Sequence, residues 1–271
     1  CLNYITLQHI IETITGQSLR DFAKENIFDI LGMQYTDYLP TIQQQDGKWI
    51  NTVACPWMDW IAPTEKQKDG SVLCGQVHDP LARILNGGIS GNAGIFSNAN
   101  DIGILAAALL NGGEYNGRRI LSPLGVKTMC TVPRELTAFG RTPGWDIFSP
   151  YASNKGDLFS PNTFGHTGYT GTSIIIDPDN DTAVILLVNA VHPEDRHSIV
   201  RLRSLVANAV AASICPPAQV YTDHYYKRFL QFETETPISP KDIVMVGNSL
   251  TENGGNWSKR LNKKNIRNRG I

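Results

Sequence analysis

The 271-residue sequence lacks long apolar runs, a strong net charge and any Cys-x-x-Cys motif. Its apolar segments, such as residues 183–188, are far shorter than the ~20 residues that a membrane-spanning helix needs. The formal net charge of −1 gives no sign of the basic surface that binds nucleic acid. A hydrophobic content of 41% still permits a substantial core, so the length predicts one large domain or two smaller ones.

Cysteine is scarce, and an odd, scattered set of five does not indicate a disulfide framework. Cys55 and Cys74 flank a polar loop and could pair in an exported protein, but two unpaired thiols are the favoured alternative. His192 and His197 have no acidic or cysteine partner at ligand spacing, so we expect them on the surface. Nothing in the sequence indicates a metal site.

Residues 165–189 predict a β-hairpin around which the chain is organised. Two runs rich in β-branched residues are separated by the turn-forming segment 177–181. Gly165 to Gly168 is expected to open the first strand, where small residues would let a ligand approach the backbone closely. On its own, His-Thr-Gly is a weak signal, and a glycine-rich strand edge that carries one solvated histidine is the favoured alternative.

The residues that follow make the interpretation more specific. HTGYTGTSIIIDP, followed by VILLVNAVHP, resembles one branch of the serine β-lactamase and penicillin-binding-protein family. That family carries a Lys-Thr-Gly strand motif beside its nucleophile, and this branch has His-Thr-Gly there. The resemblance continues upstream through residues 78–102 and 144–150, and it covers about residues 1–215. It implies an α/β domain of the α+β type, with a central antiparallel sheet flanked by helices.

The resemblance also assigns site residues. His166 and Thr167 would hydrogen-bond the substrate from the strand edge, and Gly168 would keep that edge accessible. The backbone N–H of Tyr169 would be one donor of the oxyanion hole. No metal or cofactor is implied.

Two further positions are expected to contact substrate. CLNYITLQHIIE resembles the segment that begins at the last residue of the family's Tyr-x-Asn motif, so Cys1 occupies the Asn position. Asn92 lies in a loop that reads Gly-Asn-Ala-Gly, where the branch usually has Gly-His-Ala-Gly.

The catalytic serine of this family is not found in the sequence. Acyl transfer needs a Ser-x-x-Lys pair, because a free serine hydroxyl is a poor nucleophile. No Ser-x-x-Lys occurs here, so we expect the chain to be an internal piece of a longer protein, with its first domain at 1–217.

Apolar spacing predicts the flanking elements. Leu7, Ile10, Ile11 and Ile14 would form the core face of a first helix, and Ser18 with Asp21 would cap a second. Ser97 and Ser122 are expected to cap later helices. A helix at 198–212 is expected to pack on the hairpin through an apolar stripe that includes Ile199, Leu202 and Leu205. A strand is expected to begin at 145–148.

The composition changes after Pro217, and residues 218–271 are expected to form a linker and the start of a second domain. A helix over 223–235 would precede a strand at 243–246 whose unbroken apolar run is typical of a strand buried on both faces. VMVGNSLTENGG resembles the first block of the SGNH (GDSL-like) hydrolases, with Ser249 as nucleophile and Gly270 as an oxyanion donor. The alternative is an ordinary strand–turn–helix with a serine in the turn.

We therefore expect an exported bacterial serine hydrolase, periplasmic or extracellular, that acts on an ester or amide and is fused to an SGNH-type esterase. The substrate would be a β-lactam, a peptidoglycan stem peptide or a small ester. The alternative is a binding module that keeps the hydrolase fold without its nucleophile. On either view the fragment itself is expected to be inactive.

Overall fold

The computed structural model describes residues 1–149, 154–195, 198–214, 223–235, 237–247, 253 and 256–270. The chain divides into two compact units, Cys1–Ser213 and Ile214–Ile271. The predicted domain boundary at 217/218 lies outside the described residues. No helix among the described residues combines the length and apolar character needed to cross a membrane.

The first unit begins with helices and short hairpins. Helix α1 (Leu2–Thr15) is followed by α2 (Leu19–Ala23), the π-helical turn η1 (Lys24–Phe28) and α3 (Asp29–Leu31). Strand β1 (Asp37–Tyr38) pairs with β4 (Ile95–Phe96), and β2 (Thr41–Gln43) pairs with β3 (Trp49–Asn51). The short helices η2 (Met58–Trp60) and η3 (Leu81–Leu85) lie in the long connection between β3 and β4.

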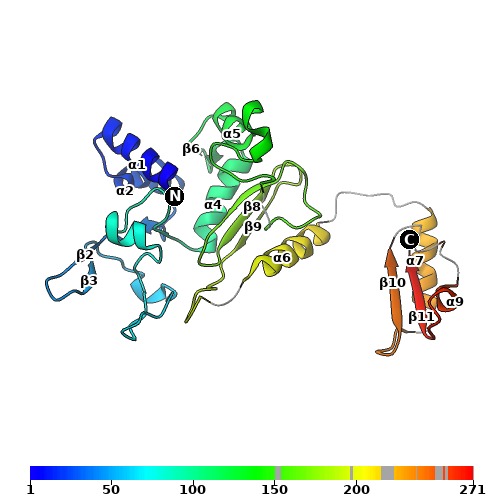
Figure 1. The fold of residues 1–271 in the computed structure, drawn as a ribbon. Helices are drawn as coiled ribbons and strands as arrows, with labels where there is room; N and C mark the ends of the chain where they lie inside the picture. The colour runs from blue at the N-terminus through cyan, green and yellow to red at the C-terminus, as the bar shows by residue number, and fades with distance from the viewer. Residues whose placement is uncertain are drawn as a thin grey trace. The chain divides into compact units, whose positions relative to one another are not determined.

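The second half of this unit contains the main sheet. Helix α4 (Ala99–Leu110), the β5–β6 hairpin (Glu114–Tyr115, Arg118–Arg119), α5 (Pro123–Cys130) and η4 (Arg134–Phe139) precede it. Strands β7 (Phe164–Thr167), β8 (Ser173–Asp177) and β9 (Thr182–Leu186) form an antiparallel sheet in that order, and α6 (Val200–Ser213) follows. Figure 1 shows β8 and β9 with α4 on one side and α6 on the other.

Strand β8 is the central strand, and its side chains explain the layers. Ile176 is completely buried and packs with Ala106 and Leu109 of α4, Val126 of α5 and Phe164 of β7. Ile175, on the opposite face of the strand, is also buried. The predicted β8–β9 hairpin and the mixed α/β fold are therefore confirmed.

The hairpin prediction was wrong in one respect. Gly165 to Gly168 does not open the first strand of the hairpin but belongs to β7 and the turn after it, so the sheet has one more strand. Gly171 has φ 122°, and a Cβ there would lie 2.3 Å from the carbonyl oxygen of Val188. The turn is therefore restricted to glycine at this point, which the apolar pattern alone does not show.

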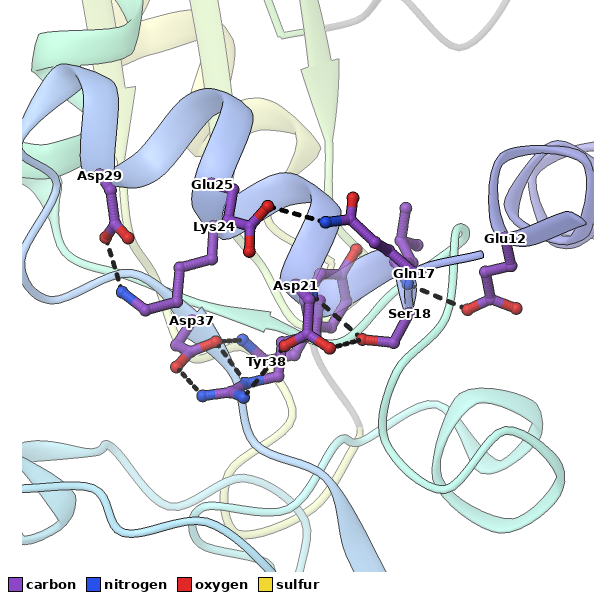
Figure 2. Close-up of polar contacts among 11 residues, drawn as sticks. Glu12, Gln17, Ser18, Asp21, Lys24, Glu25, Asp29, Asp37 and Tyr38 are labelled. Atoms are coloured by element: carbon purple, nitrogen blue, oxygen red, sulfur yellow. Dashed lines mark hydrogen bonds and ion pairs between the residues drawn. The ribbon is translucent and has the colours of Figure 1, made fainter. Parts of the chain in front are cut away.

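Local capping chemistry was predicted well at two helices. Ser18 accepts a hydrogen bond from the Asp21 N–H at 3.1 Å, and Ser122 caps α5 with a proline at its first turn. Figure 2 shows Ser18 and Asp21 of the α2 cap together with the Asp37 carboxylate of β1. That carboxylate accepts two hydrogen bonds from Arg20 of α2, at 2.8 and 2.7 Å. A bidentate pair of this kind fixes α2 against the strand.

Several other predictions were wrong. Of the predicted core face of α1, Ile11 packs against the core, but Leu7, Ile10 and Ile14 are exposed, Ile14 to 78%, while Gln8 is buried. Asn98, not Ser97, caps α4, because the Ser97 hydroxyl is used in a hydrogen bond with Thr36. Residues 145–148 form no strand, and only Asp146 makes isolated bridges. Helix α6 buries Arg203 and Ala207 rather than Leu202 and Leu205.

The second unit contains α7 (Asp223–Thr234), β10 (Ile243–Gly247), α9 (Trp257–Arg260) and β11 (Ile266–Gly270). Strands β10 and β11 are parallel, with Gly247 opposite Gly270. The predicted helix and strand are therefore present. Ile243 is exposed, however, so β10 is not buried on both faces.

Asp177, at the end of β8, provides a stability test. Its carboxylate is 1% exposed and accepts four hydrogen bonds, from the Ser160 N–H and hydroxyl, the Asp179 N–H and the Asn180 amide. Burial by itself raises the pKa of Asp177, but the hydrogen bonds from Ser160, Asn180 and Asp179 outweigh burial, and the pKa lies below its ordinary value.

We expect Asp177→Ala to lower the free energy of unfolding by roughly 2–4 kcal/mol, because loss of the carboxylate leaves buried hydrogen-bond donors without an acceptor. Since the folded-state pKa is lowered, this stabilisation is present at neutral pH and disappears as the pH falls through that pKa. Urea unfolding across acidic and neutral pH measures the effect. The exposed Asp179→Ala variant is the control, with a change below about 1 kcal/mol. An equal effect of the two variants would contradict this account.

Candidate active site

The outer edge of β7 is covered at its start and open at its end. Gly165 exchanges two backbone hydrogen bonds with Asp146, at 2.9 and 3.0 Å, so this residue points away from β8. Backbone direction alternates along an antiparallel strand, so Thr167 points its N–H and C=O to the same outer side. The N–H of Tyr169 has no partner among the described residues. An extended ligand could therefore pair with the strand from Thr167 onward.

The His166 ring is oriented by its neighbour's backbone. Its Nδ1 lies 2.9 Å from the carbonyl oxygen of Thr167. A carbonyl oxygen can only accept, so the contact requires the proton to be on Nδ1. The Nε2 atom of the neutral ring is then left as an acceptor for a ligand or a neighbouring hydroxyl.

The turn after β7 is tight and leaves no space at Gly168. The Gly168 N–H donates to the Thr172 carbonyl at 2.8 Å, and the Gly171 N–H donates to the Gly168 carbonyl at 3.1 Å. A Cβ on Gly168 would lie 2.3 Å from the Thr172 hydroxyl oxygen. A side chain at this position therefore requires either the Thr172 side chain or the turn to move.

Arg203 of α6 holds this turn from the helix side. Its Nη2 donates to the carbonyl oxygens of Gly168 and Thr172, at 2.8 and 3.0 Å. The side chain is 8% exposed, and burial lowers the pKa of its guanidinium. No carboxylate pairs with it among the described residues.

Tyr169 projects outward at the tip of the turn and is 75% exposed. Its ring stacks on His78, with centroids 5.8 Å apart and planes inclined by 20°, and its hydroxyl donates to Asp195. Nε2 of His78 lies 3.5 Å from a carboxylate oxygen of Glu65. The hydrogen bond to Asp195, and then the charge of that carboxylate, raise the pKa of Tyr169. Three distant segments therefore meet around this ring.

Helix α1, which begins just after Cys1, holds the loop that carries Asn92. Gln8 of α1 accepts from the Gly91 N–H at 3.0 Å and donates to the Ile89 carbonyl at 3.1 Å. The Asn92 side-chain oxygen accepts from Ser90 at 2.7 Å, which leaves its amide nitrogen without a partner among the described residues. Cys1 is exposed, and its carbonyl receives the first hydrogen bonds of α1.

The remaining candidates divide between described and undescribed positions. Ser249 lies outside the described residues, whereas Gly270 ends β11 opposite Gly247. Cys55 and Cys74 are both free thiols. Within the described part of the chain, no group of three His, Cys, Asp or Glu side chains is arranged to hold a metal ion.

Sequence reasoning missed Arg203, Glu65 and Asp195, and it left the role of His78 open. Only Arg203 gave a local signal, because a charged residue four positions after Ile199 falls on the apolar stripe of its helix. Such a residue is expected to be buried and paired. The others come from loops, where no periodicity indicates a contact.

Comparisons with known proteins identify relatives of this chain. A family model described as Beta-lactamase matches residues 2–208. The curated Escherichia coli K12 protein named "Putative D-alanyl-D-alanine carboxypeptidase" is 35% identical over 205 residues, and the match covers 70% of this chain and 44% of that protein. A protein of the same name from Salmonella gallinarum is 33% identical over the same shares of both chains. The chain thus spans less than half the length of the curated relatives it matches.

Among solved structures, a β-lactamase from Mycobacterium bovis matches with a TM-score of 0.51. It is 18% identical, and the match covers 79% of this chain and 62% of that one. At this identity the likeness shows the fold alone.

The Tyr169 contacts can be tested in the isolated chain. We expect Asp195→Ala to lower the pKa of Tyr169 toward its ordinary value, because a phenolate beside Asp195 loses a hydrogen bond and is repelled by the carboxylate. Carbon NMR titration of labelled tyrosine measures the shift, and Tyr169→Phe assigns the signal. The exposed Asp59→Ala variant is the control. An unchanged pKa in Asp195→Ala would show that the hydrogen bond does not form.

Proposed function

Because the chain belongs to the beta-lactamase family of serine hydrolases, we propose that it carries the substrate-binding strand of an enzyme that cleaves an ester or amide through an acyl-enzyme. His166, Thr167 and Gly168 form the third motif of the His-Thr-Gly branch. The family match supports acyl-enzyme chemistry, and the roles proposed for the three residues follow from their place in the motif.

The observation that carries this proposal is the open edge of β7. Thr167 presents its N–H and C=O outward, the C=O also accepting from the His166 ring, and the Tyr169 N–H has no partner among the described residues. A substrate lying along this edge would pair with Thr167, and its acyl oxygen would receive the Tyr169 N–H. A backbone donor of this kind acts where negative charge develops, and each is worth about 3–4 kcal/mol of barrier.

The proposed substrate is a peptide amide of the peptidoglycan type that ends in D-alanyl-D-alanine. Its extended backbone suits a strand edge, and the relatives named D-alanyl-D-alanine carboxypeptidases support this class. Asn92 would contribute its amide nitrogen, which has no partner among the described residues, and Cys1 would be a further substrate contact. β-Lactams and small esters are alternative substrates for the same geometry. A peptidoglycan substrate places the protein in the periplasm or outside the cell.

The proposal requires a nucleophile from outside this sequence. A Ser-x-x-Lys pair in the complete protein would supply the serine and its base, because none occurs in these 271 residues. His166 Nε2 would then accept a hydrogen bond from the substrate or from a catalytic hydroxyl. The binding-module alternative lacks that pair and would bind the same ligands without turnover.

The second unit is proposed to begin an SGNH-type esterase with Ser249 as nucleophile. The parallel pairing of β10 with β11 supports this, because it brings Gly247 and Gly270 to one edge, and Ser249 follows β10 directly. Open α/β sheets place their sites beyond the carboxyl ends of such strands. Gly270 would then serve as an oxyanion donor.

Fluorophosphonate labelling with mass-spectrometric mapping tests both assignments. The complete protein should be labelled at the serine of a Ser-x-x-Lys pair, and residues 1–271 alone should show no labelled serine in the first unit. Ser249 should react only when downstream sequence supplies a histidine base. Labelling of a serine of the first unit in the isolated chain would show that the nucleophile of this unit has been assigned wrongly. Unchanged hydrolysis of p-nitrophenyl acetate in Ser249→Ala would remove the SGNH assignment.

Gly168→Val in the complete protein should abolish most turnover of the first unit. The added Cβ meets the Thr172 hydroxyl at 2.3 Å, so either the Thr172 side chain or the turn that carries the Tyr169 N–H must shift, and the branched side chain crowds the edge that the substrate approaches. Losing the alignment of one oxyanion donor predicts a fall in kcat of about 10²–10³-fold. Circular dichroism should show a folded protein. The isosteric Thr170→Val change in the same turn is the control, and unchanged kcat/KM in Gly168→Val would remove this strand from the site.

A further inference from the structure

The carbonyl of Gly168 and the N–H of Tyr169 belong to one peptide unit. That unit is planar and trans, so the two groups point in opposite directions. Whatever holds the Gly168 oxygen therefore also fixes the direction of the Tyr169 N–H. In this chain the oxygen accepts from the Gly171 N–H at 3.1 Å and from Arg203 Nη2 at 2.8 Å.

Arg203 holds both ends of the turn with one nitrogen. The same Nη2 donates to the Thr172 carbonyl at 3.0 Å, and that carbonyl also accepts from the Gly168 N–H. The contact reaches across 31 and 35 residues of sequence, from α6 to the end of β7 and the start of β8. Gly171 alone would close the turn, but it would not anchor the turn to the body of the domain.

The environment of Arg203 is unusual for a structural arginine. Its side chain is 8% exposed, its Nε has no hydrogen-bond partner, and no carboxylate pairs with it among the described residues. Burying a cation is costly unless its charge is compensated. Here the compensation comes from carbonyl oxygens, so the positive charge acts directly on the Gly168–Tyr169 peptide.

We propose that Arg203 is a positioning residue for catalysis, which orients and polarises the Gly168–Tyr169 peptide so that its N–H faces the acyl oxygen of the substrate. The inference rests on the proposed function, because it needs Tyr169 to be an oxyanion donor. A cation at the carbonyl end of a peptide strengthens its N–H as a donor, since hydrogen bonds in a chain polarise one another. The effect is greatest when charge develops on the acyl oxygen, in the transition state.

A purely structural role makes a different prediction. If Arg203 only anchors α6, replacing it would lower stability but leave the rate of the acylation step unchanged in the fraction of the protein that is folded. A positioning role changes that rate while substrate binding is preserved, because Thr167 still pairs with the substrate. The ratio of the effects on kcat and KM separates the two roles.

The experiment uses the complete protein with an ester and a peptide substrate. Arg203→Met removes the charge, Arg203→Lys keeps it without the planar fork, and the exposed Arg201→Met on the same helix is the matched control. We expect kcat to fall about 10–100-fold in Arg203→Met, less than the loss of a whole oxyanion donor, with KM nearly unchanged. Arg203→Lys should recover part of the rate, and added methylguanidinium should partly rescue Arg203→Met but not Arg203→Lys.

Each outcome decides the question. An Arg203→Met protein that melts lower but keeps its kcat would overturn the inference, as would a loss confined to KM. If Arg203→Met fails to fold, a wild-type kcat in Arg203→Lys would overturn it instead. Failure of the proposed function would look different, because the wild-type protein would then bind substrate without forming an acyl-enzyme. A reduced but measurable kcat in the variants tests only the role of Arg203.

Discussion

The arrangement of the candidate site depends on one buried cation, Arg203, and on the two carbonyl oxygens that it holds. This contact ties α6 to the turn between β7 and β8. The position of the turn determines where β7 stops pairing with β8. Gly171, at φ 122°, and Gly168 allow the chain to reverse direction between β7 and β8. The open edge of β7 is thus a consequence of how the turn is held.

Sequence patterns predicted the elements whose cause is local. The β8–β9 hairpin follows from two β-branched runs around an Asp- and Asn-rich turn, and the Ser18 and Ser122 caps follow from hydrogen bonds made within one helical turn. The patterns failed where the cause lies elsewhere in the chain. The spacing of Leu7, Ile10 and Ile14 correctly indicates a helix, but which face is buried depends on the segments that pack against it.

The same distinction applies to the site. His166, Thr167 and Gly168 could be identified because they are contiguous and form a motif, and the structure adds the hydrogen bond that fixes the His166 ring. Arg203, His78 and Asp195 could not be identified, because they reach Tyr169 and its turn from three separate segments. An arginine on the apolar stripe of α6 is the one clue that a careful pattern analysis could have used. The roles of Cys1 and Asn92 stay predictions.

The central claim is that the Tyr169 N–H receives the acyl oxygen while Arg203 holds the other end of the same peptide. A crystal structure of the complete protein with a phosphonate analogue bound to its catalytic serine tests this most directly. The account predicts a phosphoryl oxygen within hydrogen-bond distance of the Tyr169 nitrogen, the ligand along the β7 edge at Thr167, and Arg203 still on the Gly168 oxygen. A phosphoryl oxygen held by other donors, with the Tyr169 N–H turned away from it, would contradict the account.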